Sequence, residues 1–300
     1  MTLASSSGNR GRTRAVPPAG RTPDPTTHLA RFDPATSGVI VDIEERRRRT
    51  GEALDPARRA ELGQFFTPSE VAAFMADMFE VTDRPARLLD PGAGVGSLTA
   101  AVAARWRRDG GGPLTVTAVE ADPLLHEPLG RTIAELGKVH QVNGAVVEGD
   151  FIEWAAGHVS GFGALEAPKF DLVVMNPPYR KIHTASHERR TLAAAGIEVP
   201  NLYAGFVALA AELLDHQGQL VAIIPRSFTN GPYFRRFRRL LLDRIGLQQI
   251  HVLDSRDVAF ADSAVLQENV VIRGVRGERT AAVVVSSSRS VAEPVTTREV

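Results

Sequence analysis

The 300-residue sequence has no cysteine, no excess of either charge and no long apolar run. The missing cysteines exclude disulfides, cysteine-ligated zinc and a thiol nucleophile, and they fit a cytosolic protein. Because 35 Lys and Arg balance 35 Asp and Glu, a nucleic-acid partner would need local basic clusters instead of an overall positive field. No apolar stretch approaches the ~20 residues of a membrane span, and no apolar segment follows the first arginines as in a secretory signal.

Length and composition predict one large domain with appendages, since 43% hydrophobic residues are enough for a core. Residues 1–36 are rich in Ser, Gly, Arg, Pro and Thr without apolar periodicity, so we predict a disordered tail. Residues 37–85 should form a helical segment and residues 86–275 the main domain. The last segment, 276–300, holds a short apolar strand, Ala281–Val285, and is predicted to be the start of a truncated or missing region.

A helix is expected to begin near Thr67. Thr67 fits an N-cap, Pro68 fits the first helical position, and Glu70 would complete a capping box. Apolar residues then recur at helical spacing, which indicates a helix face packed in the core.

Strand-like and helix-like segments alternate after Pro85, with helices such as Ser97–Arg107, Leu202–Leu214 and Tyr233–Ile245. This alternation predicts an α/β fold: a Rossmann-like, doubly wound, mostly parallel seven-stranded sheet with helices on both faces. No long helical segment separates the last two strands, so we expect them to form an antiparallel closing pair. The predicted strands are Arg87–Asp90, Thr115–Glu120, Ala145–Asp150, Phe170–Met175, Leu220–Ile224, Ile250–Leu253 and Asn269–Val275.

A glycine-rich loop, LLDPGAGVGSL, spans residues 88–98. An apolar strand ends at Asp90, and a helix follows the loop. Gly92, Gly94 and Gly96 would let backbone N–H groups approach a ligand at the helix N-terminus. The spacing also occurs in ordinary strand–helix turns and differs from the dinucleotide pattern, but its context favours a nucleotide site.

Acidic residues stand at or near the ends of the next two predicted strands. Glu120 occupies the position where doubly wound folds bind ribose hydroxyls, and Asp122 is the alternative acid. Asp150 could accept a hydrogen bond from an adenine amino group, and Phe151 could lie against the adenine face. Taken alone, a turn aspartate before a core phenylalanine explains this last pair equally well.

The fourth strand runs into Asn176, Pro177, Pro178 and Tyr179, and two consecutive prolines cannot continue a central strand. The Asn176 amide oxygen and the Pro177 carbonyl are adjacent acceptors that suit an NH₂ group with two protons. Accepting both protons favours a pyramidal nitrogen that can attack a methyl donor in line. Tyr179 offers an aromatic face for an extruded base, worth ~1–3 kcal/mol.

These four segments, in this order, resemble the S-adenosylmethionine-dependent amino-methyltransferases over roughly residues 60–275. The segment Gly63–Pro68 (GQFFTP) is similar to one that packs over the cofactor's methionine end in gamma-order adenine-N6 DNA methyltransferases. The resemblance implies catalytic roles for Asn176, Pro177 and Tyr179. It implies S-adenosyl-L-methionine contacts at Thr67, Pro68, Asp90, Gly92, Gly94, Glu120, Asp150, Phe151 and Asn176.

Three further segments, Asn201–Ala210, Ile223–Arg238 and Ser255–Asn269, resemble the PstI/BsuBI type of modification methyltransferase. This resemblance implies N6-methyladenine as product, within a type II restriction-modification system. It also implies Phe260 as a second aromatic against the base, and residues 276–300 as the start of a target-recognition region. The implied partner is double-stranded DNA with a flipped adenine. The protein is expected to be a monomer and to have no membrane partner. A cognate restriction endonuclease would be a functional partner, not a physical one.

Two other functions stay open at this point. One is a protein glutamine-N5 methyltransferase, which shares the Asn-Pro-Pro-Tyr motif but lacks the Gly-Gln-Phe-Phe-Thr-Pro segment. The other is a non-catalytic cofactor- or DNA-binding subunit.

Arg180, Lys181 and Arg235 are candidate phosphate ligands. The histidines show no metal-ligand spacing, so no metal site is predicted.

Overall fold

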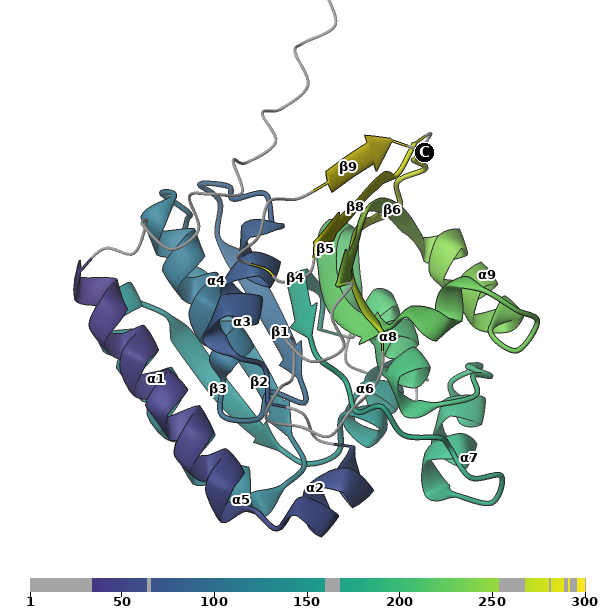
Figure 1. The fold of residues 1–300 in the computed structure, drawn as a ribbon, viewed down its shortest axis with the longest axis horizontal. Helices are drawn as coiled ribbons and strands as arrows, with labels where there is room; N and C mark the ends of the chain where they lie inside the picture. The colour runs from purple at the N-terminus through teal and green to yellow at the C-terminus, as the bar shows by residue number, and fades with distance from the viewer. Residues whose placement is uncertain are drawn as a thin grey trace, which may run out of the picture.

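The computed structural model describes residues 34–63, 66–159, 168–253, 268–280, 282–288, 291 and 296–299. In this part of the chain the strands form a nine-stranded sheet in the order β3-β2-β1-β4-β5-β7-β6-β8-β9 (Figure 1). The strands are β1 Ala86–Pro91, β2 Leu114–Glu120, β3 Asn143–Glu148, β4 Phe170–Met175, β5 Leu214–Pro225, β6 Ile245–Leu253, β7 Asn269–Arg276, β8 Val284–Ser288 and β9 Thr296–Glu299.

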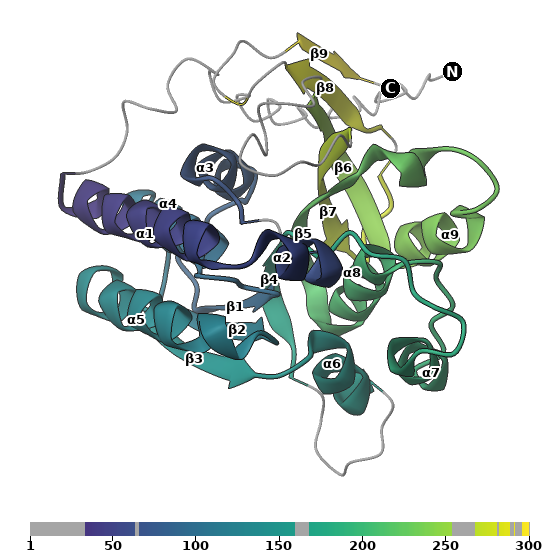
Figure 2. The same cartoon turned by 60° about the horizontal axis from the view of Figure 1, so that its bottom comes forward.

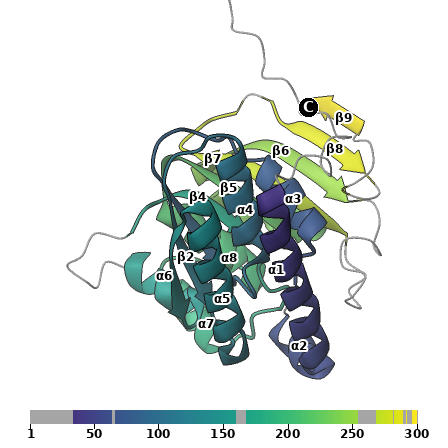
Figure 3. The same ribbon diagram turned by 90° about the vertical axis from the view of Figure 1, so that its left-hand side faces the viewer.

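Two groups of helices cover the sheet. Helices α1, α3, α4 and α5 contact one another on one side, and α6 to α9 pack together on the other (Figure 2). Figure 3 shows α1, α4 and α5 side by side. The helices are α1 Pro34–Ala53, α2 Pro56–Leu62, α3 Ser69–Asp77, α4 Ser97–Arg108, α5 Pro123–His140, α6 Phe151–Val159, α7 His187–Ala194, α8 Leu202–Leu213 and α9 Arg235–Arg244, with a 3-10 turn, η2, at Arg226–Thr229.

Strands β1 to β5 are parallel, and the strand order reverses between β1 and β4. Leu88 of β1 pairs with Leu172 of β4, so the loop after Pro91 and the chain after Met175 leave the sheet side by side. In open α/β sheets, ligands bind beyond the carboxyl ends of the strands at such a reversal. The fold therefore brings the glycine loop and Asn176 to one place.

The seven predicted strands are all present, and the closing pair β6–β7 is antiparallel as expected. Strand β4 has the predicted bounds. Strand β3 ends at Glu148, two residues before Asp150, because Asp150 belongs to the start of α6. Strands β8 and β9 extend the sheet, and the predicted strand Ala281–Val285 overlaps only the start of β8. Helix α1 begins at Pro34, before the predicted boundary.

The prediction for the start of α3 was wrong. Pro68 is the N-cap, without a side-chain capping bond, and the helix begins at Ser69. The Ser69 N–H donates instead to Glu44 Oε2 of α1 at 3.1 Å, so a carboxylate from another helix takes the place of the capping box. The expected core face is confirmed, since Val71 and Met75 are buried. Among the described residues, no helix is long and apolar enough to cross a membrane.

Candidate active site

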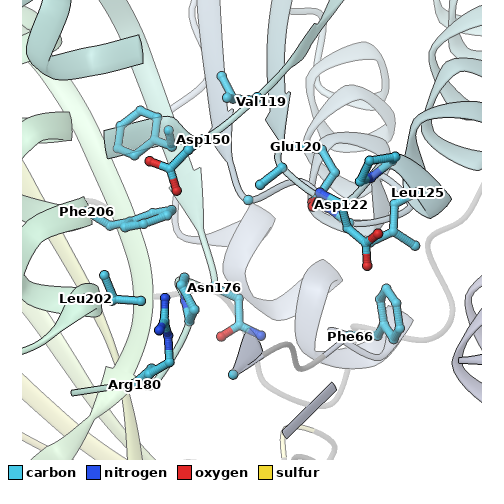
Figure 4. A pocket seen from close by; sticks show the side chains of 18 of the residues that line it. Phe66, Val119, Glu120, Asp122, Leu125, Asp150, Asn176, Arg180, Leu202 and Phe206 are labelled. Atoms are coloured by element: carbon cyan, nitrogen blue, oxygen red, sulfur yellow. Dashed lines mark hydrogen bonds between the residues drawn. The ribbon is translucent and has the colours of Figure 1, made fainter. Parts of the chain in front are cut away.

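A cavity lies at the carboxyl ends of β1 to β4 (Figure 4). We call one part of its lining the acidic side, made by Gly92, Gly94, Glu120, Asp122 and Asp150. We call the part after β4 the amide side, made by Asn176, Pro178 and Arg180. Aromatic and aliphatic residues complete the wall, among them Phe66, Phe151, Leu202 and Phe206.

The glycine loop is tied to the next strand and has a backbone that favours glycine. The N–H groups of Gly92 and Ala93 both donate to the Val119 carbonyl, at 2.8 and 3.0 Å. Gly92, Gly94 and Gly96 have φ values of 74°, 60° and 87°, in the left-handed region. A Cβ at Gly96 would lie 2.8 Å from Thr132, so α4 and α5 would have to move apart. The loop therefore presents bare backbone to the cavity at the start of α4.

Glu120 holds the acidic side together. Its Oε2 accepts from the Gly94 N–H at 2.7 Å, and its Oε1 accepts from the Asp122 N–H at 2.8 Å. Burial raises the pKa of Glu120, and the backbone N–H groups of Asp122, Gly94 and Ala121 oppose that shift. A carboxylate has about four lone-pair sites, so acceptor capacity remains for a hydroxyl donor in the cavity.

Asp122, the alternative acid, is committed to other partners. It caps α5 by accepting from the Leu124 N–H, and its Oδ1 also pairs with Arg58 of α2 at 2.8 Å. Its side chain is only 1% exposed. The geometry therefore favours Glu120 over Asp122 as the acceptor for a ligand, while the Arg58–Asp122 pair anchors α2 beside the cavity.

Asp150 and Phe151 start α6 at the far end of the acidic side. Asp150 accepts from the Glu153 N–H at 3.1 Å, and burial raises the pKa of its carboxyl group. The ring of Phe151 is buried and lies 4.9 Å from the ring of Phe206, which comes from α8. The two rings, tilted by 45° to each other, and the carboxylate make an apolar niche with one polar edge.

Asn176 is held by a residue from far away in the sequence. Its Nδ2 donates to Thr67 Oγ1 at 3.1 Å, and Thr67 is buried just before α3. Figure 4 shows the amide of Asn176 between Arg180 and the opposite wall that carries Phe66. The predicted capping hydroxyl of Thr67 thus fixes the amide of the Asn-Pro-Pro-Tyr turn instead of α3.

Tyr179 directly follows Pro178 of the amide side and is not among the residues that line the cavity. Its hydroxyl donates to the Ile223 carbonyl at 3.1 Å, and its ring makes an edge contact with Tyr203 at 6.4 Å. Burial raises the pKa of Tyr179 well above its usual range. The phenol is therefore neutral and anchored, and a Cβ at Gly63, just after α2, would lie 3.2 Å from the backbone nitrogen of Tyr179.

Asp90 is the predicted contact that the structure places elsewhere. It is fully buried beneath the loop and does not line the cavity. Its Oδ2 accepts from the hydroxyl and the N–H of Thr99 at 2.6 and 3.2 Å, which ties β1 to α4. Burial raises the pKa of Asp90 to about 7. The residue forms part of the floor of the acidic side, and its contact with the cofactor stays a prediction.

The remaining predicted residues are distributed around the site. Pro68 caps α3 outside the cavity, and Arg180 lines the cavity and pairs with Glu188 at 2.9 Å. Lys181 is exposed, and Arg235 is exposed on α9. Phe260 lies outside the described residues.

Sequence reasoning missed two of the cavity residues, Phe206 and Arg58. Phe206 follows Leu202 by four positions, so both lie on one face of α8, and this spacing was a usable signal. Arg58 carries no such signal, because its place depends on how α2 packs beside α5.

The chain is similar to two type II methyltransferases over most of its length. It is 43% identical over 242 residues to the type II methyltransferase M.BsuBI of Bacillus subtilis, covering 79% of this chain and 48% of that protein. It is 38% identical over 277 residues to M.PstI of Providencia stuartii, covering 90% and 53%. The chain is a homologue of these type II methyltransferases. It spans about half the length of each.

Residues 131–259 match the family model of the Eco57I restriction-modification methylases. The fold is that of class I S-adenosylmethionine-dependent methyltransferases, represented by a Listeria monocytogenes structure with a TM-score of 0.59 and 14% identity over 76% of this chain and 67% of that one. A methyltransferase subunit of a type I restriction-modification system from Streptococcus thermophilus gives a TM-score of 0.56 at 20% identity over 74% and 47%. The sheet, the loop and the cavity therefore belong to a methyltransferase fold.

Proposed function

We propose that the chain is the catalytic part of a type II restriction-modification methyltransferase, which methylates the N6 amino group of adenine in double-stranded DNA with S-adenosyl-L-methionine as donor. One observation carries the proposal: Asn176 shares a cavity with Glu120, Asp150 and the glycine loop. The homology to M.BsuBI and M.PstI supports the same reaction class.

The acidic side fits the cofactor. Gly92 and Gly94 lack side chains where the methionine part must pass, and Glu120 has lone pairs left for the ribose hydroxyls. The niche of Phe151 and Phe206 suits the adenine ring, with Asp150 to accept from its amino group. When bound, the cofactor supplies an electrophilic methyl group on a sulfonium, and this chemistry needs no metal.

The amide side fits the target amine. Asn176 and the Pro177 carbonyl accept the two hydrogens of the amino group and direct its lone pair toward the cofactor side of the cavity. The nitrogen becomes cationic on methylation and then releases one proton to solvent. Thr67 keeps the Asn176 amide in place, so the acceptors are ordered before the base arrives.

Tyr179 is proposed to stack against the adenine once it is flipped out of the duplex, because enzymes that flip a base stack it between aromatic or apolar side chains. Its hydroxyl bond to Ile223 limits how far the ring can turn. Phe260 is proposed as the second aromatic contact. We expect the enzyme to act as a monomer, on one flipped base at a time.

A label-transfer assay tests this function. The chain is incubated with radiolabelled S-adenosylmethionine and, separately, duplex DNA, RNA or a protein release factor. Label in duplex DNA that is lost in Asn176→Ala supports the proposal. Label in the release factor alone indicates a glutamine methyltransferase, and cofactor binding without any transfer indicates a non-catalytic subunit.

A further inference from the structure

The first five residues of helix α9 include four arginines that have different surroundings. Arg238 points into the turn, and Arg236 pairs with Glu198. Arg235 and Arg239 are four positions apart on an exposed face, and neither forms an ion pair among the described residues. Of these four, Arg235 and Arg239 are therefore the ones that the described part of the chain leaves available to bind an anion from outside the protein.

Arg238 makes the turn rigid. Its guanidinium donates to the carbonyls of Phe228, Asn230 and Gly231, at 2.9, 3.2 and 2.7 Å. Gly231 itself has a φ of 73°, a conformation that favours glycine. This rigid turn presents Tyr233, one of the three tyrosines of the chain, and its side chain is 61% exposed.

This surface is close to the proposed target site. Ring contacts lead from Tyr179 to Tyr203 at 6.4 Å, from Tyr203 to Phe234 at 5.8 Å and from Phe234 to Tyr233 at 5.0 Å. The turn follows η2 at the carboxyl end of β5, which pairs with β4 beside the Asn176 turn. The major groove of a DNA duplex is about 12 Å wide. When one base of a duplex enters the cavity, the phosphates that flank this base therefore lie at distances comparable to those between the rings.

We propose that Tyr233, Arg235 and Arg239 bind the sugar–phosphate backbone of the duplex beside the base that enters the cavity. This inference rests on the proposed function and names the surface that orients its substrate. The chain has no net charge, so backbone binding needs a local cationic face. Two unpaired guanidiniums and a phenol are common phosphate ligands, and they set register without reading sequence.

The test is duplex binding by the full chain as a function of salt. Fluorescence anisotropy with a labelled duplex, from 50 to 200 mM NaCl, gives the slope of log Kd against log salt. Each lost phosphate contact lowers this slope by about 0.9. In the double variant R235Q/R239Q the slope should therefore decrease by about 2. Its affinity at 150 mM salt should be at least 10-fold weaker for duplexes of any sequence.

The matched control is R84Q/R107Q. Both arginines are exposed and form no ion pair among the described residues, but they lie at the amino ends of the strands, before β1 and at the end of α4. Its slope and affinity should equal those of the wild type. Cofactor affinity and melting temperature should be unchanged in both variants, because none of the four side chains lines the cavity.

An unchanged slope in R235Q/R239Q, or an equal loss in R84Q/R107Q, would overturn the proposal. Tighter binding of RNA than of duplex by this surface would also overturn it. The label-transfer assay distinguishes a failure of this proposal from a failure of the proposed function. If DNA is methylated but the slope is unchanged in R235Q/R239Q, the phosphate-binding surface is rejected and the methyltransferase function is kept. If the wild type transfers no label to DNA, both proposals are rejected.

Discussion

The two sides of the cavity are held in different ways. On the acidic side, the carboxylates are fixed by backbone N–H groups of neighbouring loops and of the start of α6: Glu120 by Gly94 and Asp122, and Asp150 by Glu153. These loops follow directly from strands of the sheet. On the amide side, Asn176 is bound by a hydroxyl that lies 109 residues earlier in the chain, at Thr67.

This difference extends to the helices outside the sheet. Thr67 stands just before Ser69, whose N–H is held by Glu44 of α1. The Glu44 carboxylate is in turn bound by Arg47 at 2.7 Å. The acidic side therefore depends on the sheet, and the amide side depends on α1 and α3. Changes on the acidic side should weaken cofactor binding, whereas changes on the amide side should slow methyl transfer.

The largest effect is expected from Asn176→Ala. Loss of an ordered polar group that acts in the transition state costs ~10²–10³-fold in kcat. Cofactor affinity, measured by isothermal titration, should stay close to that of the wild type. Asn143→Ala, at the exposed start of β3, is the control and should keep full activity. A selective loss of cofactor affinity in Asn176→Ala would break the division between the two sides.

Glu120→Gln should act in the opposite way. The amide has one acceptor oxygen, so it cannot serve both the Gly94 and the Asp122 N–H groups, and one buried donor is left unsatisfied. The expected loss of cofactor affinity is ~10–100-fold, from ~1–3 kcal/mol. The exposed Glu127→Gln on α5 is the control. An unchanged Kd for the cofactor in Glu120→Gln would contradict the assignment.

Thr67→Val should produce a smaller change on the amide side. Removing the hydroxyl that binds Asn176 Nδ2 costs ~0.5–1.5 kcal/mol, which lowers kcat by roughly 3–10-fold. Thr67→Ser keeps the hydroxyl and should restore the rate. If Thr67 mainly binds the cofactor, Thr67→Val will instead raise the cofactor KM at constant kcat.

The smallest effect concerns the floor of the acidic side. Burial raises the pKa of Asp90 from 3.8 to about 7, so the folded protein retains a proton that the unfolded chain releases. The contribution of Asp90 to stability is fully present below pH 3.8 and is lost as the pH rises to about 7. The side chain of Asp90→Asn does not titrate. Between pH 5 and 7.5 the melting temperature of the wild type should therefore fall by a few degrees more than that of the variant. If the melting temperatures of the two proteins change with pH in parallel, Asp90 is ionised over the whole range from pH 5 to 7.5.

Residues that follow directly from strand ends could be predicted from the sequence on both sides of the cavity. The ends of β2 and β4 coincide with the ends of apolar runs, so Glu120 and Asn176 could be placed from local patterns. The glycine spacing likewise reflects a backbone conformation that is local to the loop. For Asp90 the same pattern fits a ligand contact or a buried tie to Thr99, and only packing distinguishes the two.

Long-range contacts were beyond sequence reasoning. The bond from Asn176 to Thr67, the Arg58–Asp122 pair and the capping of α3 by Glu44 each join segments that no local pattern connects. The parallel pairing of β8 with β6 is of the same kind. These contacts join α1, α2 and α3 to the site and extend the sheet edge, so the sequence could not predict how these elements pack.

The most direct test of the central claim is the identity of the methylated product. Duplex DNA is incubated with the chain and S-adenosylmethionine, digested to nucleosides and analysed by liquid chromatography with mass spectrometry. We predict N6-methyldeoxyadenosine, which disappears with Asn176→Ala. Methylation of cytosine, or a product that persists in Asn176→Ala, would contradict the account.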